Sequence, residues 1–207
     1  MGRSSRRRAV RLALLLSGGV LACLGGYVAI LLLTVGTFPW TQGTYTTEGA
    51  APCELVDGSV LRRWTGVDST SRDNSVGSTH ACKASSGTGD SPGSASIEIS
   101  VRVTRTDREA SFGWSDTKNF WLSTVRDERS TTAGDLPNLG QDAFFVRRVI
   151  GSGWVDYRLS VLDANLTLDV NTRVEFHNDV GASADDMNDI QAISEQHARR
   201  ALDQLRR

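Results

Sequence analysis

Three cysteines are the residues whose chemistry the sequence specifies most directly. Cys53 lies in the segment PCEL and Cys82 in THACKA, whereas Cys23 lies in an apolar run near the N-terminus. No C-x-x-C pair is present for redox exchange. Neither Cys53 nor Cys82 has cysteine or histidine partners at the spacing of a zinc site. If this part of the chain is exported to an oxidising compartment, the two cysteines are expected to form a structural disulfide that contributes roughly 3–4 kcal/mol.

Signatures of common enzymes are absent from the sequence, which contains no G-x-S-x-G elbow, P-loop, H-E-x-x-H or EF-hand loop. Ser115 and Lys118 fit the S-x-x-K motif of penicillin-interacting serine enzymes. No S-D-N or K-T-G motif follows, so a helix start capped by Ser115 or Asp116 explains these residues better. The three histidines are far apart in the sequence: His80, His177 and His197. We therefore predict no catalytic residue, no metal site and no cofactor.

Three tryptophans allow two interpretations. Trp114, Trp121 and Trp154 could together line an apolar pocket between a helix and a sheet, as a lipid- or glycan-binding module requires. Large aromatic side chains also commonly fill a protein core. The sequence leaves both interpretations open.

The segment from Leu12 to Phe38 contains no charged residue. As a helix it would be roughly 40 Å long, more than the ~30 Å hydrocarbon core requires. The alternative interpretation is a lipoprotein signal peptide that is cleaved before Cys23, in the sequence VLAC. An apolar run that continues well past Cys23 is too long for a signal peptide. We therefore predict an uncleaved transmembrane helix over residues 12–38.

The flanks of this segment predict its orientation and a contact face. Arg3, Arg6, Arg7, Arg8 and Arg11 precede it and no basic residue follows it closely, so the N-terminus is expected inside and the C-terminal domain outside the cytoplasm. A face of small residues at every fourth position would allow a homodimer through the helix: Gly18, Ala22 and Gly26. The alternative is that membrane helices are rich in glycine without pairing.

Charge and composition exclude one class of partner. The residues from Glu48 onward carry 18 Lys and Arg against 24 Asp and Glu, a net charge of −6. A nucleic-acid-binding domain would be basic, so no nucleic-acid partner is expected. Only Lys83 and Lys118 are lysines among the basic residues, which is typical of a high-GC genome such as that of an actinobacterium.

Periodicity predicts helices and strands beyond residue 52. A helix is expected over 59–64, with Ser59 as its cap. Residues 78–85 and 94–105 are expected to form the two strands of a hairpin. An amphipathic helix is expected over 112–129, with Phe120, Trp121 and Val125 facing inward. A loop over 134–142 precedes strands at 143–150, 155–161 and 166–176, and a last helix begins after Ser183 with Asp186 completing its capping box.

These elements predict an α+β fold with a mainly antiparallel sheet and helices packed on it. The domain organisation is a basic stub (1–11), the transmembrane helix (12–38), a linker (39–51) and one extracytoplasmic domain (52–207).

Two segments carry a resemblance to a known group of proteins. PCELVDGSVLRRWTG, with a second cysteine about thirty residues later, and DLPNLGQDAFF resemble actinobacterial cell-envelope proteins of unknown function. The matching positions are Cys53, Cys82, Leu139, Gly140, Ala143 and Phe144. Related envelope lipoproteins and kinase sensor domains are similar to the PsbP-like α/β/α sandwich. The resemblance implies an exported domain and supplies no catalytic residue.

The function expected from these features is that of a membrane-anchored, non-enzymatic module that binds a ligand, a lipid or a partner protein of unknown identity. Two alternatives remain: a cell-envelope hydrolase or transferase, and a structural subunit of a membrane complex.

Overall fold

The computed structural model describes residues 44–48, 51–88, 90–125, 130–151, 153–177 and 181–206. The predicted stub, the predicted transmembrane helix with Gly18, Ala22, Cys23 and Gly26, and most of the predicted linker lie outside these residues. In the described ranges, no helix has both the length and the apolar character needed to cross a membrane.

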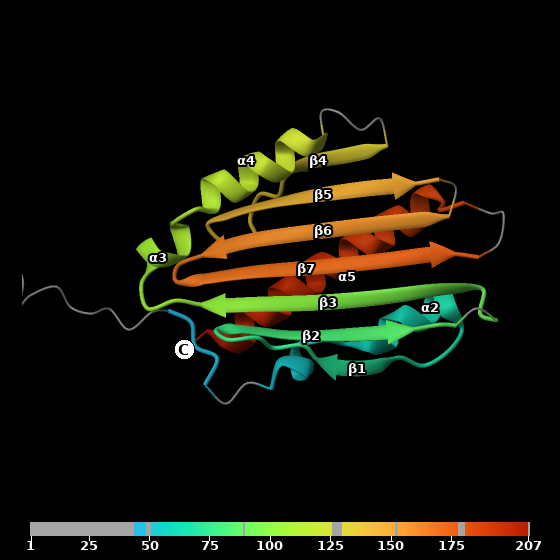
Figure 1. The fold of residues 1–207 in the computed structure, drawn as a ribbon, viewed down its shortest axis with the longest axis horizontal. Helices are drawn as coiled ribbons and strands as arrows, with labels where there is room; N and C mark the ends of the chain where they lie inside the picture. Colours follow the sequence, from blue (N-terminus) through green and yellow to red (C-terminus); the bar gives the residue numbers. More distant parts are fainter. Residues whose placement is uncertain are drawn as a thin grey trace, which may run out of the picture. The chain divides into compact units, whose positions relative to one another are not determined.

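Within the described ranges, seven strands form one sheet in the order β1-β2-β3-β7-β6-β5-β4, and every neighbouring pair is antiparallel (Figure 1). The strands are β1 (Thr70–Asp73), β2 (Thr79–Ser86), β3 (Gly93–Val103), β4 (Thr131–Asp135), β5 (Asp142–Ile150), β6 (Trp154–Asp163) and β7 (Leu166–Phe176). The predicted α+β class with a mainly antiparallel sheet is confirmed.

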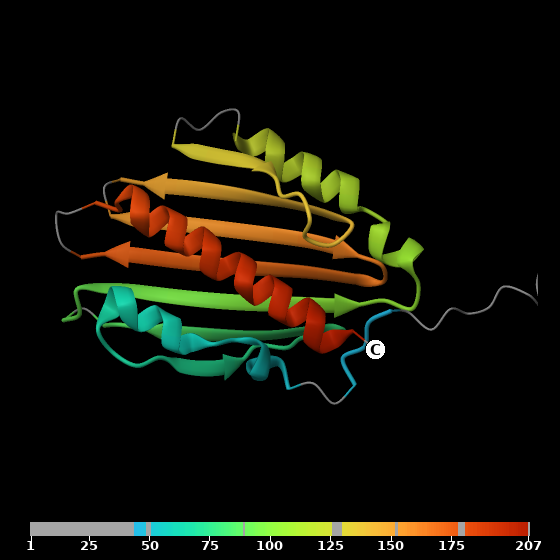
Figure 2. The ribbon, with the colours of Figure 1, turned by 180° about the vertical axis from the view of Figure 1, so that it is seen from behind.

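One face of the sheet forms the hydrophobic core, because apolar residues alternate with polar ones along the central strands. The predicted strand over 155–161 is confirmed as part of β6, whose core-side residues are fully buried: Val155, Tyr157, Leu159 and Val161. The helix α5 (Ala184–Leu205) crosses diagonally over this face (Figure 2). Its buried residues include Ile190, Ile193, Ala201, Leu202 and Leu205.

The start of α5 has the predicted capping box. The Ser183 hydroxyl accepts a hydrogen bond from the Asp186 N–H at 3.1 Å, and the Asp186 carboxylate accepts one from the Ser183 N–H at 3.0 Å. Two N–H groups that the first helical turn leaves unpaired are thereby satisfied.

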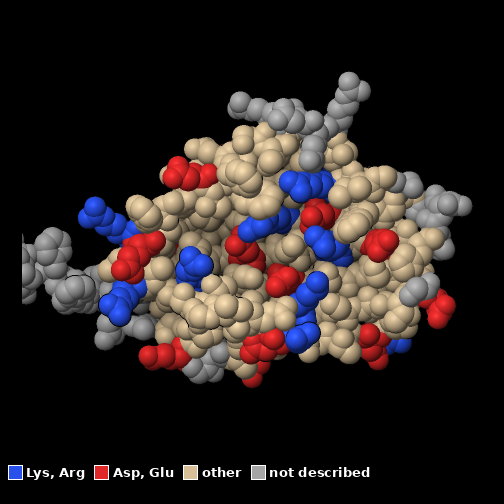
Figure 3. Space-filling view, viewed as in Figure 1, with Lys and Arg blue, Asp and Glu red and all other residues tan. Residues whose placement is uncertain are grey.

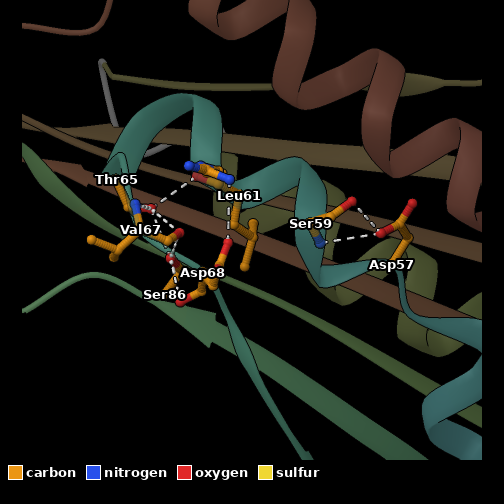
Figure 4. A network of polar contacts seen from close by, with 8 residues as sticks. Asp57, Ser59, Leu61, Thr65, Val67, Asp68 and Ser86 are labelled. Atoms are coloured by element: carbon orange, nitrogen blue, oxygen red, sulfur yellow. Dashed lines mark hydrogen bonds and ion pairs between the residues drawn. The ribbon is translucent and has the colours of Figure 1, made fainter.

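Short helices precede the sheet in sequence: η1 (Pro52–Leu55), η2 (Gly58–Leu61) and α2 (Arg62–Thr65). The helical prediction for residues 59–64 is confirmed, but the cap is Asp57 rather than Ser59. The Asp57 carboxylate accepts from both the N–H and the hydroxyl of Ser59, at 3.1 and 2.6 Å (Figure 4). At the other end, the buried hydroxyls of Thr65 and Ser86 lie 2.7 Å apart and join α2 to β2.

A helix lies within the predicted range 112–129, but it begins later than predicted, and of the predicted inward residues Trp121 and Val125 are partly buried whereas Phe120 is exposed. The chain forms two helices, α3 (Asp107–Ser111) and α4 (Trp114–Thr124), separated at Gly113, whose φ is 76°. Phe120 is 60% exposed rather than buried.

The strands at the two edges of the sheet, β1 and β4, are missing from the predicted elements. The predicted loop over 134–142 is wrong at its start, because Gly134 and Asp135 end β4 and pair with Phe145 and Phe144. All of β1 is exposed and polar, so no apolar alternation marks it in the sequence.

Part of the predicted linker belongs to the domain. Tyr45 is fully buried, its N–H donates to the Asn165 side chain at 2.9 Å, and its hydroxyl donates to Asp163. Residues 44–48 are therefore fixed beside the turn between β6 and β7.

Candidate functional site

The face of the sheet opposite α5 is the candidate site, and we call it the polar face. Its side chains come from the positions of β2, β3, β6 and β7 that alternate with the core residues. Lys, Arg, Asp and Glu side chains are interleaved over its middle (Figure 3). The helix α4 borders this face beside β5, and α3 lies at one end of the strands next to β6 and β7, so the middle of the face is not covered by helices (Figure 1).

Arginine and tryptophan side chains stack on one another on the polar face. The Arg158 guanidinium lies 4.4 Å from the centre of the Trp121 ring, and that of Arg148 lies 5.6 Å from it. Arg173 lies 5.2 Å from the Trp154 ring. Stacking of this kind holds planar, charged groups in a fixed orientation at the surface.

Cross-strand ion pairs fix the same arginines. Arg158 contacts Asp169 at 3.0 Å, and Asp169 also accepts a hydrogen bond from the Ser160 hydroxyl. Arg173 contacts Asp156 at 3.6 Å. Because each pair joins neighbouring strands β6 and β7, the charges are held in place before any ligand arrives.

Several polar atoms on this face are buried without a hydrogen-bond partner among the described residues. They are Trp154 Nε1, Asp156 Oδ1, Arg158 Nε and Asn171 Oδ1. An unpaired buried polar group costs about 1–3 kcal/mol. A stable sheet does not require such a cluster, which makes this part of the face a candidate for recognition rather than for packing.

A cavity of about 280 Å³ lies at the end of the polar face, between the strands and the helices α3 and α4. Its floor is formed by β3 and β7, and its wall by residues 109–117. The charged residues that line it are Arg102, Glu109 and Asp169, and the aromatic ones are Phe112 and Trp114. Side chains with hydroxyl groups form most of the rest: Thr79, Ser100, Thr104, Thr117 and Thr167.

The wall of this cavity is attached to the sheet by polar contacts of α4. Trp114 Nε1 donates to Asp142 at 2.7 Å, and the Lys118 ammonium contacts Asp142 at 2.7 Å and Asp135 at 2.8 Å. The Trp114 ring also packs on Phe144 at 5.5 Å. Burial raises the pKa of the Asp142 carboxyl, but the hydrogen bonds from Lys118 and Trp114 outweigh it and hold the pKa below its ordinary value of 3.8.

We expect acid to weaken this attachment. A carboxyl with a lowered pKa in the folded state stabilises the fold above its ordinary pKa, and the contribution is lost as pH falls through the folded-state pKa. In urea unfolding at pH 7 and at pH 3, the wild type should lose more stability between the two than Asp142→Asn does. Asp135→Asn is the matched control, since Asp135 also contacts Lys118 but is more exposed. Equal pH dependence in the wild type and Asp142→Asn would contradict this role.

The structure brings together only some of the residues singled out in the sequence. Cys53 and Cys82 form a disulfide, with Cα atoms 5.0 Å apart. Trp114 lines the cavity, whereas Trp121 and Trp154 lie on the polar face beneath arginines and are not among the residues that line it. Lys118 is occupied by two carboxylates.

The histidines lie on separate elements. His80 is on β2, His177 follows β7, and His197 is buried on α5. His197 lies near Asp57 and Ser59 but does not form a catalytic relay with them. Its Nε2 accepts from the Asp57 N–H at 3.1 Å and its Nδ1 donates to a carbonyl, so the contact is structural. The described residues contain no group of three or more metal-ligating side chains.

Sequence reasoning missed the residues of the polar face that matter most here: Arg102, Phe112, Arg158, Asp169 and Arg173. One signal was present, because charged residues occupy the positions that alternate with the apolar ones in β3, β6 and β7. Which of them lie together depends on strand register, which that pattern does not contain.

No family model matches the chain, and no curated protein matches its sequence. One similar solved structure is the extracellular domain of PknH from Mycobacterium tuberculosis. It has a TM-score of 0.43 and 10% sequence identity, over 75% of this chain and 98% of that chain. A similarity at this level does not indicate a shared function.

Proposed function

We propose that the chain is a membrane-anchored, non-catalytic binding module, displayed outside the cytoplasm, that recognises its ligand or partner with the polar face. The observation that carries the proposal is the set of arginines on this face, stacked on tryptophans and paired with carboxylates of the neighbouring strand. Arginine and tryptophan are the residues most enriched where binding energy concentrates.

Pre-organisation supports this assignment. An arginine that is free in solution loses rotamer entropy on binding, whereas Arg158 and Arg173 are already held by a ring and by a carboxylate. The unpaired atoms of Trp154, Asp156 and Asn171 lie in the same part of the face. A small movement of the arginine side chains on binding would allow these unpaired atoms to form hydrogen bonds.

Two features support the proposed location of the domain outside the cytoplasm and its membrane anchor. The Cys53–Cys82 disulfide is typical of an oxidising compartment outside the cytoplasm. The uncharged run over residues 12–38, with arginines only on its N-terminal side, is long enough to span a bilayer with the N-terminus inside.

Site-specific photo-crosslinking tests which face binds. Benzophenone inserts into C–H bonds of peptides, lipids and sugars alike, so it does not presuppose the ligand. We expect benzoylphenylalanine at Ser96, on the polar face opposite Arg173, to give adducts in cells that produce the full chain. The same residue at Gln196, exposed on the opposite side on α5, is the matched control. Adducts at Gln196 alone, or at no position, would overturn the proposal.

A further inference from the structure

We propose that the cavity beside α3 and α4 binds one ring of a neutral saccharide. This inference rests on the proposed function, because it assigns a ligand class to one end of the polar face. The hydrogen-bonding groups, the aromatic rim and the charge of the cavity support it in turn.

The size of the cavity limits what can enter it. Small-molecule sites usually enclose about 300–1,000 Å³, and this cavity, at about 280 Å³, lies just below that range. A single sugar ring suits such a volume, and the rest of an oligosaccharide would then extend along the open sheet. A lipid tail would need an apolar lining, but hydroxyl and charged side chains predominate here.

The hydrogen-bonding groups of the cavity are available. Among the described residues, the hydroxyls of Ser100, Thr117 and Thr167 have no hydrogen-bond partner. The Arg102 guanidinium has one long contact, to the Thr79 hydroxyl at 3.4 Å. Hydroxyl groups both donate and accept, which matches the hydroxyls of a sugar better than the acceptor-only oxygens of a phosphate.

An aromatic side chain without a packing role forms the rim. Phe112 lies between α3 and α4, lines the cavity and is 89% exposed. An exposed phenyl ring has no stabilising role in the fold, but it offers an apolar surface to the C–H groups of a sugar ring. Phe120, on α4, is also exposed but does not line the cavity.

The charge of the cavity favours a neutral ligand. The charge of Asp169 is matched by Arg158, which contacts it at 3.0 Å. Arg102 and Glu109 remain, with opposite charges that cancel. Because the cavity carries no net positive charge, it would not compensate the desolvation of a strongly anionic ligand such as a phosphate.

Calorimetric titration of the full chain in phospholipid nanodiscs tests the inference, because sugar-headed detergents would compete for the cavity. The probes are N,N′-diacetylchitobiose, maltose, cellobiose and α-1,6-mannobiose, with inorganic phosphate and a neutral tripeptide for comparison. We expect at least one disaccharide to bind saturably at one site. Phe112→Ala should weaken this binding roughly tenfold, whereas the matched variant Phe120→Ala should bind as the wild type does.

Absence of saturable binding by all four disaccharides would overturn the saccharide inference, as would equal weakening by Phe112→Ala and Phe120→Ala. If the tripeptide binds instead and Phe112→Ala weakens it, the saccharide inference fails and the proposed function stands. If crosslinking on the polar face also gives no adduct, both fail. Urea unfolding of each variant verifies that it is folded.

Discussion

Replacing both bridged cysteines, Cys53→Ala with Cys82→Ala, is expected to lower the free energy of unfolding by about 3–4 kcal/mol. The bridge joins residues 29 positions apart, and it connects η1 to β2, the strand between β1 and β3 in the sheet. In the chain-entropy account, closing this loop restricts the unfolded chain and so raises its free energy. A domain is stabilised by only about 5–15 kcal/mol in total, so this loss is a large share of it. Urea unfolding of the full chain, followed by tryptophan fluorescence, measures the change.

Two comparisons isolate the bridge from the loss of sulfur atoms. Reducing the wild type with dithiothreitol should reproduce most of the loss, and the double variant should not respond to the reductant. Cys23→Ala is the matched control for removing a cysteine outside the bridge. An unchanged unfolding midpoint in both the double variant and the reduced wild type would contradict the stabilising role.

The centre of the sheet was predictable because local physics determines it. In β3, β6 and β7 one side of each strand is buried, so apolar and polar residues alternate, and the sequence shows that pattern directly. The capping box of α5 was predictable for a similar reason, since Ser183 and Asp186 satisfy each other within one turn.

The face of α4 was not predictable from its apolar residues, because a polar contact anchors the helix. Trp114, Lys118 and Trp121 lie at helical spacing and face the sheet, and Lys118 is held there by Asp142 and Asp135. A pattern of apolar residues alone places Phe120 inward as well, although its side chain is exposed. The edge strands β1 and β4 are short and polar, and they form through pairing with a neighbouring strand that their own residues do not predict.

The polar face depends on contacts between residues far apart in the sequence. Arg173 lies opposite Asp156 and Ser96, and Asn171 lies opposite Arg158 and Glu98, because of the registers of β6 and β3 against β7. The stacking of Trp121 on Arg158 further requires α4 to lie beside β6. The sequence supplies the residue types for a site, but only the long-range pairing of strands brings them together.

The second large effect is expected at Gly140, in the turn that precedes β5. Its φ is 66°, and an added Cβ would lie 2.7 Å from Val161 Cγ1 and 2.8 Å from the Leu162 carbonyl oxygen. A left-handed conformation costs a residue with a Cβ roughly 1–2 kcal/mol, and overpacking against a core strand adds about 1–3 kcal/mol. Gly140→Ala should therefore lower the free energy of unfolding by about 2–5 kcal/mol, as measured by urea unfolding.

Gly66→Ala separates the two causes. Gly66 ends α2 with a φ of 72°, but an added Cβ there would have no atom within 4 Å, so only the conformational cost of about 1–2 kcal/mol applies. The difference in the free energy of unfolding between the two variants then measures the cost of the steric contact between this turn and β6. Because Gln141 donates to the Leu162 carbonyl at 2.9 Å, displacing this turn would also break the contact that sets the start of β5. Equal losses in the two variants would show that the close approach at Gly140 contributes nothing and that backbone conformation alone requires a glycine there.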